Sequence, residues 1–232
     1  MQTDLKKKVL IAGSKGAIGR ALSLKYEEMG WQVLRASRSE DSDITVNLSE
    51  DSSVAVVVDF FTGKTCPDLI INCCGLLHDS QNMPEKQLDE LNTNWLQKSF
   101  QVNLNTHVNL AKAIDKVADS SKSFTWVSLS AMIGSITDNR LGGWYSYRIS
   151  KASLNMFIKT LSIEWKRKNK QNRAFVIHPG TTKSTMSSPF NVRKDKLYEP
   201  GLTAERIISV IESTETEANG QFYNWNGANL LW

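Results

Sequence analysis

Short apolar runs alternate with longer segments of helical periodicity along most of the chain, and this alternation limits the possible folds more than any other feature. The runs that have the character of strands are residues 9–12, 32–37, 44–47, 69–72, 124–129, 174–178 and 221–225. The segments that have the character of helices are residues 17–29, 51–61, 94–118, 147–168 and 203–212. Such alternation builds βαβ units, so we predict an α/β fold in which a doubly wound parallel sheet of about seven strands carries helices on both faces.

One connection is too short for the regular pattern. Only residues 39–43 clearly separate the second expected strand from the third, whereas a crossover helix needs about ten residues or more. We therefore expect the helix between strands 2 and 3 to be missing. The 232 residues contain no repeat and no linker that would divide two domains, so we expect a single domain over residues 1–232.

The charge balance gives little support for a nucleic-acid partner. The net charge is +4, from 28 basic and 24 acidic residues. The basic clusters at residues 6–8 and 166–168 are not interleaved with aromatic residues, and cations are favoured at helix C-termini. No apolar stretch is long enough to span a bilayer, and residues 1–8 lack the apolar core of a signal peptide. We expect a cytoplasmic protein without a nucleic-acid or membrane partner.

The cysteines and histidines form no recognisable ligand pattern. The cysteines make no CxxC pair, and the histidines are far apart in the sequence: Cys66, Cys73 and Cys74, and His78, His107 and His178. We therefore expect free thiols in a reducing compartment and no metal site.

The first expected strand runs into a turn of small residues and then into a helix. The turn consists of Gly13, Ser14, Lys15, Gly16, Ala17, Ile18 and Gly19. Small residues let the backbone turn tightly and approach a pyrophosphate, whose charge then meets the free N–H groups at the start of the helix. Strand, turn and helix in this order at the N-terminus predict a Rossmann-type nucleotide-binding domain.

The end of the second expected strand indicates which nicotinamide cofactor binds. NAD sites place an acidic residue there to accept from the ribose 2′-hydroxyl. This strand ends with Ser37 and Arg38, and no carboxylate follows until Glu40. Ser37 and Arg38 suit a 2′-phosphate, and Lys15 can assist from the turn, so we expect NADPH/NADP+ rather than NADH.

The most specific motif joins a tyrosine and a lysine. Tyr147 and Lys151 are four residues apart, so on a helix they lie on one face. Such a pair is often only packing, but here it occurs with further motifs: the glycine-rich turn, Asn72-Cys73-Cys74-Gly75, Val102-Asn103-Leu104, Ser130 and Pro179-Gly180. Together they resemble the short-chain dehydrogenase/reductase family over essentially the whole chain. Residues 134–136 and 142–148 resemble, more narrowly, its C-factor-like and sniffer-like carbonyl reductase branch.

The resemblance implies catalytic roles. Tyr147 would be the general acid/base that protonates a carbonyl oxygen as hydride arrives at the carbon. A free tyrosine, with a pKa of about 10, is a poor acid near neutrality, and the Lys151 ammonium and oxidised nicotinamide are expected to lower that pKa. Lys151 would also hydrogen-bond the nicotinamide ribose. Asn103 would hold a water that links Lys151 to solvent.

The serine that orients the substrate is harder to place. In the family it usually lies three residues before a glycine, and that position is Ala131 when counted from Gly134. Its neighbour Ser130 is our first choice, because a one-residue shift at a strand end can turn its hydroxyl into the cleft. Ser135 is the second choice.

The resemblance also implies further cofactor contacts and a substrate loop. The contacts beyond the turn, the second strand and the Tyr147–Lys151 pair are Asn47, Leu48, Asn72, Cys73, Gly75, Pro179, Gly180, Thr181, Thr182 and Thr185. Residues 184–200, which include Met186, Pro189, Phe190 and Tyr198, correspond to the region that covers the substrate in the family. Trp144 is a candidate side of the substrate pocket, although simple packing explains it equally well.

These expectations describe an NADPH-dependent oxidoreductase that transfers a hydride between nicotinamide and a small carbonyl or alcohol. The alternative is a non-catalytic NADP(H)-binding sensor or C-factor-like signalling protein. An epimerase of the extended family is disfavoured, because the chain leaves too little C-terminal sequence for a sugar-nucleotide domain. One face of the long helix after Tyr147 must cover the sheet, and the other commonly pairs with a second subunit, so we expect a homodimer or homotetramer.

Overall fold

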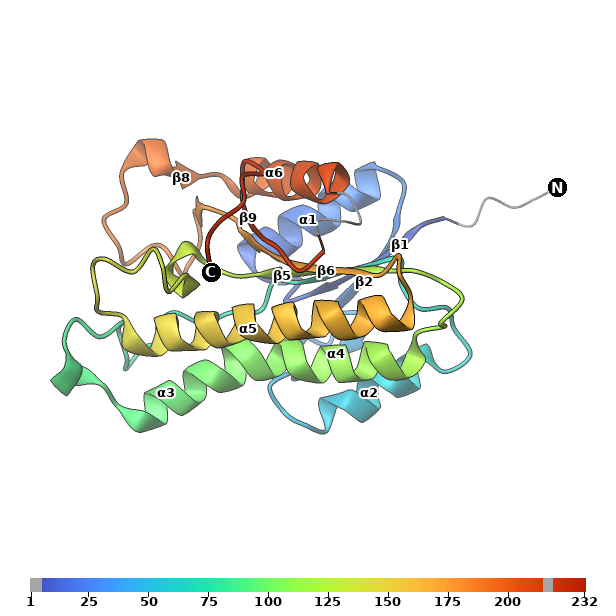
Figure 1. Cartoon of the computed structure of the whole chain (residues 1–232), viewed down its shortest axis with the longest axis horizontal. Helices are drawn as coiled ribbons and strands as arrows, with labels where there is room; N and C mark the ends of the chain where they lie inside the picture. The colour runs from blue at the N-terminus through green and yellow to red at the C-terminus, as the bar shows by residue number, and fades with distance from the viewer. Residues whose placement is uncertain (1–5, 215–218) are drawn as a thin grey trace.

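A parallel sheet of seven strands forms the centre of the computed structural model, which describes residues 6–214 and 219–232 (Figure 1). In order across the sheet, the strands are β3 (Ile44–Thr45), β2 (Gln32–Ser37), β1 (Lys8–Ala12), β4 (Leu69–Asn72), β5 (Thr125–Leu129), β6 (Arg173–His178) and β9 (Phe222–Asn224). The chain first builds outward from β1 through β2 to β3, then returns to place β4 on the other side of β1. The strand order therefore reverses between β1 and β4, where ligands bind in open α/β sheets.

Helices cover both faces of this sheet (Figure 1). On one face lie α1 (Ala17–Glu28) and α6 (Pro200–Ser213), and on the other lie α2 (Ser53–Phe61), α3 (Thr93–Phe100), α4 (Thr106–Val117) and α5 (Tyr145–Lys168). Successive residues of β1 bury their side chains on opposite faces, with Val9 and Ile11 in one core cluster and Leu10 and Ala12 in the other. The predicted doubly wound α/β fold is confirmed. The predicted single domain covers residues 1–232, of which residues 1–5 and 215–218 lie outside the described residues.

The expected gap in the pattern is also present. No helix lies between β2 and β3, and the connection is held by the hydroxyls of Ser37 and Ser42, whose oxygens are 2.7 Å apart. Strand β3 pairs with β2 over only Ile44 and Thr45, shorter than the predicted 44–47. This short connection leaves the carboxyl end of β2 open beside the start of α1.

The predicted helix over 94–118 is in fact three pieces. A π-helical turn, Gln101–Asn105, separates α3 from α4. The wider turn carries Asn103, whose side chain is fully buried and points at the backbone of Leu76 rather than at solvent. Wide turns of this kind often mark functional positions in helices.

The expected substrate loop has a paired base. Strands β7 (Thr181–Thr182) and β8 (Leu197–Tyr198) are parallel and enclose residues 183–196, so the segment is not irregular throughout. At this base the Arg206 guanidinium of α6 packs against the rings of both Tyr198 and Trp225, with Cζ 4.1 and 3.9 Å from the ring centroids, which are 5.5 Å apart. Such contacts join the loop to α6 and to the C-terminal segment.

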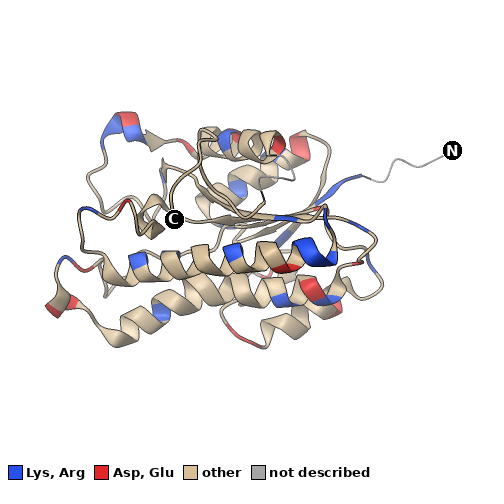
Figure 2. Cartoon of the chain, viewed as in Figure 1, with Lys and Arg blue, Asp and Glu red and all other residues tan. Residues whose placement is uncertain are grey.

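The basic cluster of residues 166–168 lies in the last turn of α5, where cations are favoured. Figure 2 shows Lys and Arg gathered in the last turn of α5, next to acidic residues of the neighbouring helices. Lys168 donates to Asp115 of α4 at 2.6 Å and lies 3.2 Å from Glu164. Within the described ranges, no helix is both long and apolar enough to cross a membrane.

Candidate nucleotide and catalytic site

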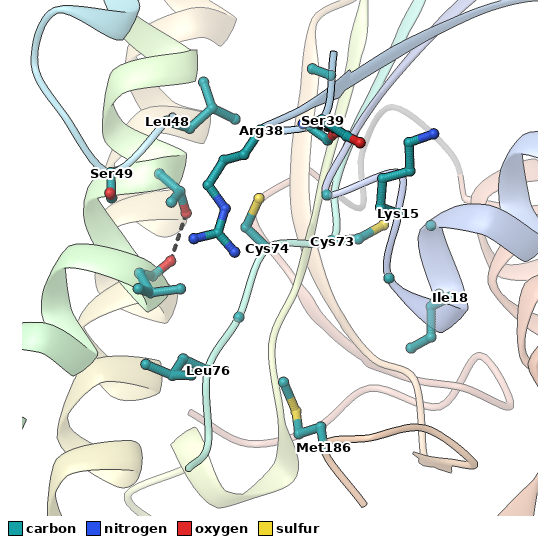
Figure 3. Close-up of a pocket in the computed structure, with 18 of the residues that line it drawn as sticks. Lys15, Ile18, Arg38, Ser39, Leu48, Ser49, Cys73, Cys74, Leu76 and Met186 are labelled. Carbon is teal, nitrogen blue, oxygen red and sulfur yellow. Dashed lines mark hydrogen bonds between the residues drawn. The ribbon is translucent and has the colours of Figure 1, made fainter. Parts of the chain in front are cut away.

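A cleft of about 1120 Å³ opens at the carboxyl ends of β1 and β4, at the point where the strand order reverses (Figure 3). Four stretches line most of it: the glycine-rich turn, the end of β2, residues 46–49 and residues 73–76. Residues 184–186 belong to the expected substrate loop, called the substrate segment below, and close the cleft from the side. Lys98, Val102 and Thr106 line it from α3, from the π-helical turn and from α4. The predicted turn and the predicted end of β2 therefore meet in one cavity.

Gly13 and Gly19 of the turn have to be glycines because other backbone atoms lie too close to admit a side chain. A Cβ atom at Gly19 would lie 2.4 Å from the Gly13 carbonyl oxygen, which no flexible side chain can relieve. Gly13 itself has φ +71°, and a Cβ there would lie 3.1 Å from the backbone of Cys73 and Cys74. The turn thus sits directly against the exit of β4.

The first turn of α1 faces the cleft without a cap from the protein. Gly16 is its N-cap and no side chain accepts from the first N–H groups. Lys15, Gly16, Ala17, Ile18 and Gly19 line the cleft, whereas Ser14 is buried and its hydroxyl donates to Ala36 of β2 at 3.4 Å. An open helix N-terminus of this kind suits a phosphate.

Arg38 is the cation best placed to meet an anion in the cleft. In Figure 3 its side chain extends from the end of β2 toward Cys74. Within the described residues Arg38 forms no ion pair, while Lys15 is paired with Asp41. This pairing lowers the pKa of the Asp41 carboxyl. Ser37, expected to bind the same anion, lines the cleft but shares its hydroxyl with Ser42.

The exit of β4 is shaped by Asn72, although Asn72 does not line the cleft. Its side chain is fully buried, accepts from the Cys74 N–H at 3.0 Å and donates to the Thr106 carbonyl at 3.2 Å. The turn that it holds presents Cys73, Cys74 and Gly75 to the cavity. Burial raises the pKa of the Cys74 thiol to about 11, so the thiol is neutral at physiological pH.

The predicted catalytic residues come together beside this turn. Lys151 is buried, donates from Nζ to the Leu129 carbonyl at 2.9 Å and lies 5.9 Å from the centroid of the Tyr147 ring. A Cβ atom at Gly75 would lie 3.6 Å from Lys151 Nζ and 3.5 Å from Asn103 Oδ1, so all three border the same space. The tyrosine, lysine and asparagine of the motif are therefore neighbours.

The Asn103 side chain is bonded within the protein. Its Oδ1 accepts from the Leu76 N–H at 2.6 Å, and its Nδ2 donates to the Leu76 carbonyl at 2.8 Å and to Ser150 Oγ at 3.0 Å. Ser150 Oγ in turn donates to the Tyr147 carbonyl at 2.9 Å. Because the amide is occupied by these contacts, it ties the β4 exit to the first turns of α5; the water-holding role stays a prediction.

Burial raises the pKa of Tyr147 to about 12. The lowering that we expected from the Lys151 ammonium and oxidised nicotinamide together concerns the site with its cofactor bound and stays a prediction. The pKa of Lys151 is itself lowered to about 8, first by burial and with a partial offset from Cys74 and Cys73. At neutral pH, the site therefore holds a protonated phenol beside a mostly protonated ammonium.

Neither candidate serine points its hydroxyl into the cleft. Ser130 is buried and donates to Asn155 Oδ1 of α5 at 2.6 Å, and Ser135 is buried and accepts from the Asp138 N–H at 3.1 Å. The expected turn of Ser130 into the cleft is not found, because its side chain follows the strand register toward α5. The substrate-orienting role of either serine stays a prediction.

Aromatic side chains from three segments gather next to Tyr147. Trp144 lies 6.4 Å from the Tyr147 ring and 5.2 Å from Phe190, and Phe190 lies 5.8 Å from His78, all between centroids. His78 Nε2 is 3.1 Å from the Met186 carbonyl, which brings the substrate segment against the β4 exit. Trp144 therefore contacts both Tyr147 and residue Phe190 of the expected substrate loop, and its role as a side of the substrate pocket stays a prediction.

The remaining predicted cofactor contacts divide into two groups. Asn47, Leu48 and Thr185 line the cleft, whereas Pro179, Gly180, Thr181 and Thr182 do not. The Thr182 hydroxyl lies 3.0 Å from that of Thr203 and so faces α6. Gly180 has φ +77° and packs against Tyr198, where a Cβ atom would lie 3.0 Å from the ring. In the structure, this stretch forms the base of the substrate segment.

Several lining residues were not predicted. They are Arg20, Ala36, Ser39, Val46, Ser49, Cys74, Leu76, Lys98, Val102, Thr106, Ser184 and Met186. Most neighbour a predicted residue in the sequence, including Val102, which precedes Asn103 in one of the motifs, but Lys98 and Thr106 come from α3 and α4. No local motif marks these two. Among the described residues, no group of histidine, cysteine or carboxylate side chains is placed to hold a metal ion.

Comparisons with known proteins identify the family of this chain. A model of the short chain dehydrogenase family matches residues 7–195. A 1-hydroxy-2-glutathionyl-2-methyl-3-butene dehydrogenase of Rhodococcus sp. (strain AD45) is 22% identical over 233 residues, which cover 97% of this chain and 99% of that protein. The C-signal protein of Myxococcus xanthus is 27% identical over 104 residues, 45% of this chain and 58% of that protein.

Two solved structures share the whole fold. The carbonyl reductase Sniffer of D. melanogaster has a TM-score of 0.84 and 20% identity, covering 98% of this chain and 100% of that chain. An NADPH-bound carbonyl reductase from chicken fatty liver has a TM-score of 0.83 and 18% identity, with the same coverage of 98% and 100%. At these identities, the likeness shows a common fold.

Proposed function

Because this chain belongs to the short-chain dehydrogenase family, we propose that it is an NADPH-dependent oxidoreductase that reduces a small carbonyl compound to an alcohol. One observation carries the proposal. Tyr147 and Lys151 lie one helical turn apart beside Gly75, which lines a cleft large enough for a dinucleotide at the reversal of strand order. The family's chemistry requires this pair next to this cleft.

The cleft fits a dinucleotide on the evidence of its own residues. Gly13 and Gly19 keep the backbone of the turn free of side chains, and the start of α1 is uncapped. Arg38 supplies a cation without a partner in the described chain, at the end of β2 where NAD sites carry a carboxylate. This arrangement favours NADPH over NADH, and the NADPH-bound carbonyl reductase of the same fold supports it.

Residues of α5 would transfer the proton in this reaction. When bound, NADPH supplies a hydride to the substrate carbon. Tyr147 is protonated at neutral pH, since burial raises its pKa to about 12, and its hydroxyl donates a proton to the substrate oxygen. The phenolate that remains is opposite in charge to the Lys151 ammonium nearby, which stabilises it. A protonated phenol at rest suits reduction better than oxidation.

The substrate oxygen lacks an obvious serine partner. Ala131 occupies the position where the family usually has its serine, and the hydroxyl of Ser130, our first choice for that role, donates to Asn155. For Ser130 to orient the substrate, its hydroxyl would have to leave that bond. In its present position, the serine holds the end of β5 against α5.

The test is NADPH and NADH binding by fluorescence, followed by NADPH oxidation with a panel of aldehydes, ketones and quinones. We expect NADPH to bind more tightly and at least one carbonyl to be reduced. The Tyr147→Phe variant removes only the hydroxyl and should lower kcat by about 100- to 10,000-fold while NADPH affinity stays unchanged. A variant that retains full turnover would contradict the role of the tyrosine.

A second candidate is a non-catalytic NADP(H) sensor or a signalling protein related in role to the C-signal. The observation that favours it is the alanine at position 131, which removes a hydroxyl that turnover in the family uses. The partial match to the C-signal protein is consistent with it. Tight NADPH binding without reduction of any carbonyl in the panel would support the sensor and contradict the reductase.

We also propose a homodimer or homotetramer. Leu154, Ile158, Leu161 and Trp165 of α5 are buried against the sheet, so the sheet accounts for them. The exposed side of the same helix still carries Ile149, Met156 and Ile163. A monomer in analytical ultracentrifugation would contradict the assembly. The location that we propose is cytoplasmic, and the three unpaired thiols support a reducing compartment.

A further inference from the structure

The first turn of α5 is held by a carboxylate from a distant part of the chain. Glu85 follows the exit of β4 and only 3% of its surface is exposed. Its side chain accepts from the Ser146 N–H at 3.2 and 3.4 Å and from the Ser146 hydroxyl, and its carbonyl accepts from the Trp144 N–H. These contacts span 61 residues of sequence and fill the N-terminus of the helix that carries Tyr147.

The backbone before this helix has an unusual conformation. Gly142 and Gly143 have φ +66° and +63°, and Trp144 continues with φ +54°. Among the described residues, Trp144 alone combines a side chain with a positive φ. A left-handed conformation strains a bulky residue, so the surroundings must hold it there.

Two groups supply that restraint. Arg148 donates from Nε to the Gly143 carbonyl at 3.0 Å and from Nη2 to the Gly142 carbonyl at 3.3 Å. Glu85 holds the other side, and a Cβ atom at Gly143 would lie 3.2 Å from its carbonyl oxygen. The glycine therefore allows the β4 exit to approach the helix start closely.

A structural requirement alone does not explain this arrangement. A serine or aspartate at position 144 would cap the helix locally and without strain. Instead, the position holds a tryptophan whose ring lies between Tyr147 and Phe190. The distant cap allows that ring to stand at the helix start, and it fixes Ser146, the residue next to Tyr147.

We propose that Glu85 is a positioning residue, which holds the first turn of α5 so that the Tyr147 hydroxyl and the Trp144 ring keep their places at the substrate. This inference rests on the proposed reductase function. Glu85 touches neither the nucleotide cleft nor the reacting atoms, so it acts through Ser146 and Trp144. It should affect kcat and the KM for the carbonyl, but not nucleotide binding.

The test compares three variants of the full chain. Glu85→Ala removes the acceptor, Glu85→Gln keeps one acceptor oxygen, and Glu90→Gln makes the same change at an exposed residue of the same loop that accepts from the Lys86 N–H. For each variant, kcat, the carbonyl KM, the NADPH Kd and the melting curve are measured. We expect Glu85→Ala to lower kcat by about ten- to hundredfold and to raise KM, with the NADPH Kd unchanged. Glu85→Gln should restore much of kcat, and Glu90→Gln should match the wild type.

The outcomes separate this inference from the function on which it rests. A wild-type protein that reduces no carbonyl overturns the proposed function before any variant is compared. A folded Glu85→Ala variant with the kcat and KM of Glu90→Gln overturns the positioning role alone, as does a parallel loss of NADPH affinity. If Glu85→Ala fails to fold, Ser146→Ala removes only the hydroxyl contact, and an unchanged kcat in that variant overturns the proposal.

Discussion

The helices α1 and α5 begin on opposite sides of the β4 exit, and their first turns are built in opposite ways. The N-terminus of α1 starts at Gly16, has no side-chain cap and faces the cleft. The N-terminus of α5 is filled by the protein's own carboxylate, Glu85. An uncapped helix start is free to receive the charge of a ligand, whereas a filled one fixes the side chains of its own first turn.

Backbone strain follows the same division. Near α1 the positive φ falls on Gly13, for which it is unstrained. Before α5 it falls on Trp144, where it costs about 1–2 kcal/mol. The helix start that we propose binds the nucleotide thus uses glycines to remove side chains, and the one that we propose carries the catalytic tyrosine accepts strain to place a side chain.

The largest effect is expected from adding one methyl group to the turn before α1. In Gly19→Ala the new Cβ would lie 2.4 Å from the Gly13 carbonyl oxygen, so the turn must open. We expect NADPH affinity to fall by about 100-fold or more and the free energy of unfolding by about 1–3 kcal/mol. Fluorescence titration and urea unfolding measure both. The control is Gly201→Ala, where a Cβ meets nothing within 4 Å; wild-type affinity in Gly19→Ala would show that the turn does not bind the nucleotide.

A smaller effect is expected at the end of β2. Arg38→Ala removes the unpaired cation of the cleft and should weaken NADPH binding by about ten- to a hundredfold, while NADH binding changes little. Arg35→Ala, on the same strand but bonded to Glu27, is the matched control. Binding constants for both cofactors check the prediction, and an equal loss for NADPH and NADH would refute recognition of the 2′-phosphate.

The smallest effect is the pH dependence of the residues on α5. The pKa of Lys151 is about 8, so kcat should fall as pH rises through 8, because the neutral amine no longer stabilises the phenolate. The contribution of Lys151 to the free energy of unfolding should instead rise with pH. Between pH 8 and about 10.4 the unfolded chain binds more protons at this residue than the folded one does, so the contribution of Lys151 to stability rises with pH.

The pH dependence is measured as kcat and melting temperature from pH 6 to about 9.5. A Lys151→Arg variant keeps its charge throughout this range, so any activity that it retains should lack the descending limb. A fall in kcat that coincides with unfolding, or that persists in this variant, would assign the limb to another group.

Local sequence patterns were sufficient to predict the fold and the segments that line the cleft. Apolar runs and the Gly13–Gly19 spacing predicted the sheet, the missing helix and the cleft, and the family resemblance drawn from the motifs is confirmed by the family match. These features depend on neighbours in sequence. They can therefore be read from periodicity and spacing.

The features that sequence reasoning missed depend on partners far along the chain. Asn103 lies in the π-helical turn and bonds the backbone of Leu76, 27 residues away, and the Ser130 hydroxyl donates to Asn155 of α5. The contact between Glu85 and Ser146 spans 61 residues and involves a carboxylate in a polar loop. Nothing in the local pattern distinguishes Glu85 from Glu90 nearby.

The paired base of residues 183–196 has a consequence for how new specificity can arise. Strands β7 and β8 and the Arg206 stack hold both ends of this segment together, apart from the glycine-rich turn and from the Tyr147–Lys151 pair. The two ends of the segment that we propose covers the substrate are thus fixed. Ser184, Thr185 and Met186 line the cleft, so only insertions or deletions beyond them, within residues 187–196, would change the segment and leave the residues that line the cleft in place.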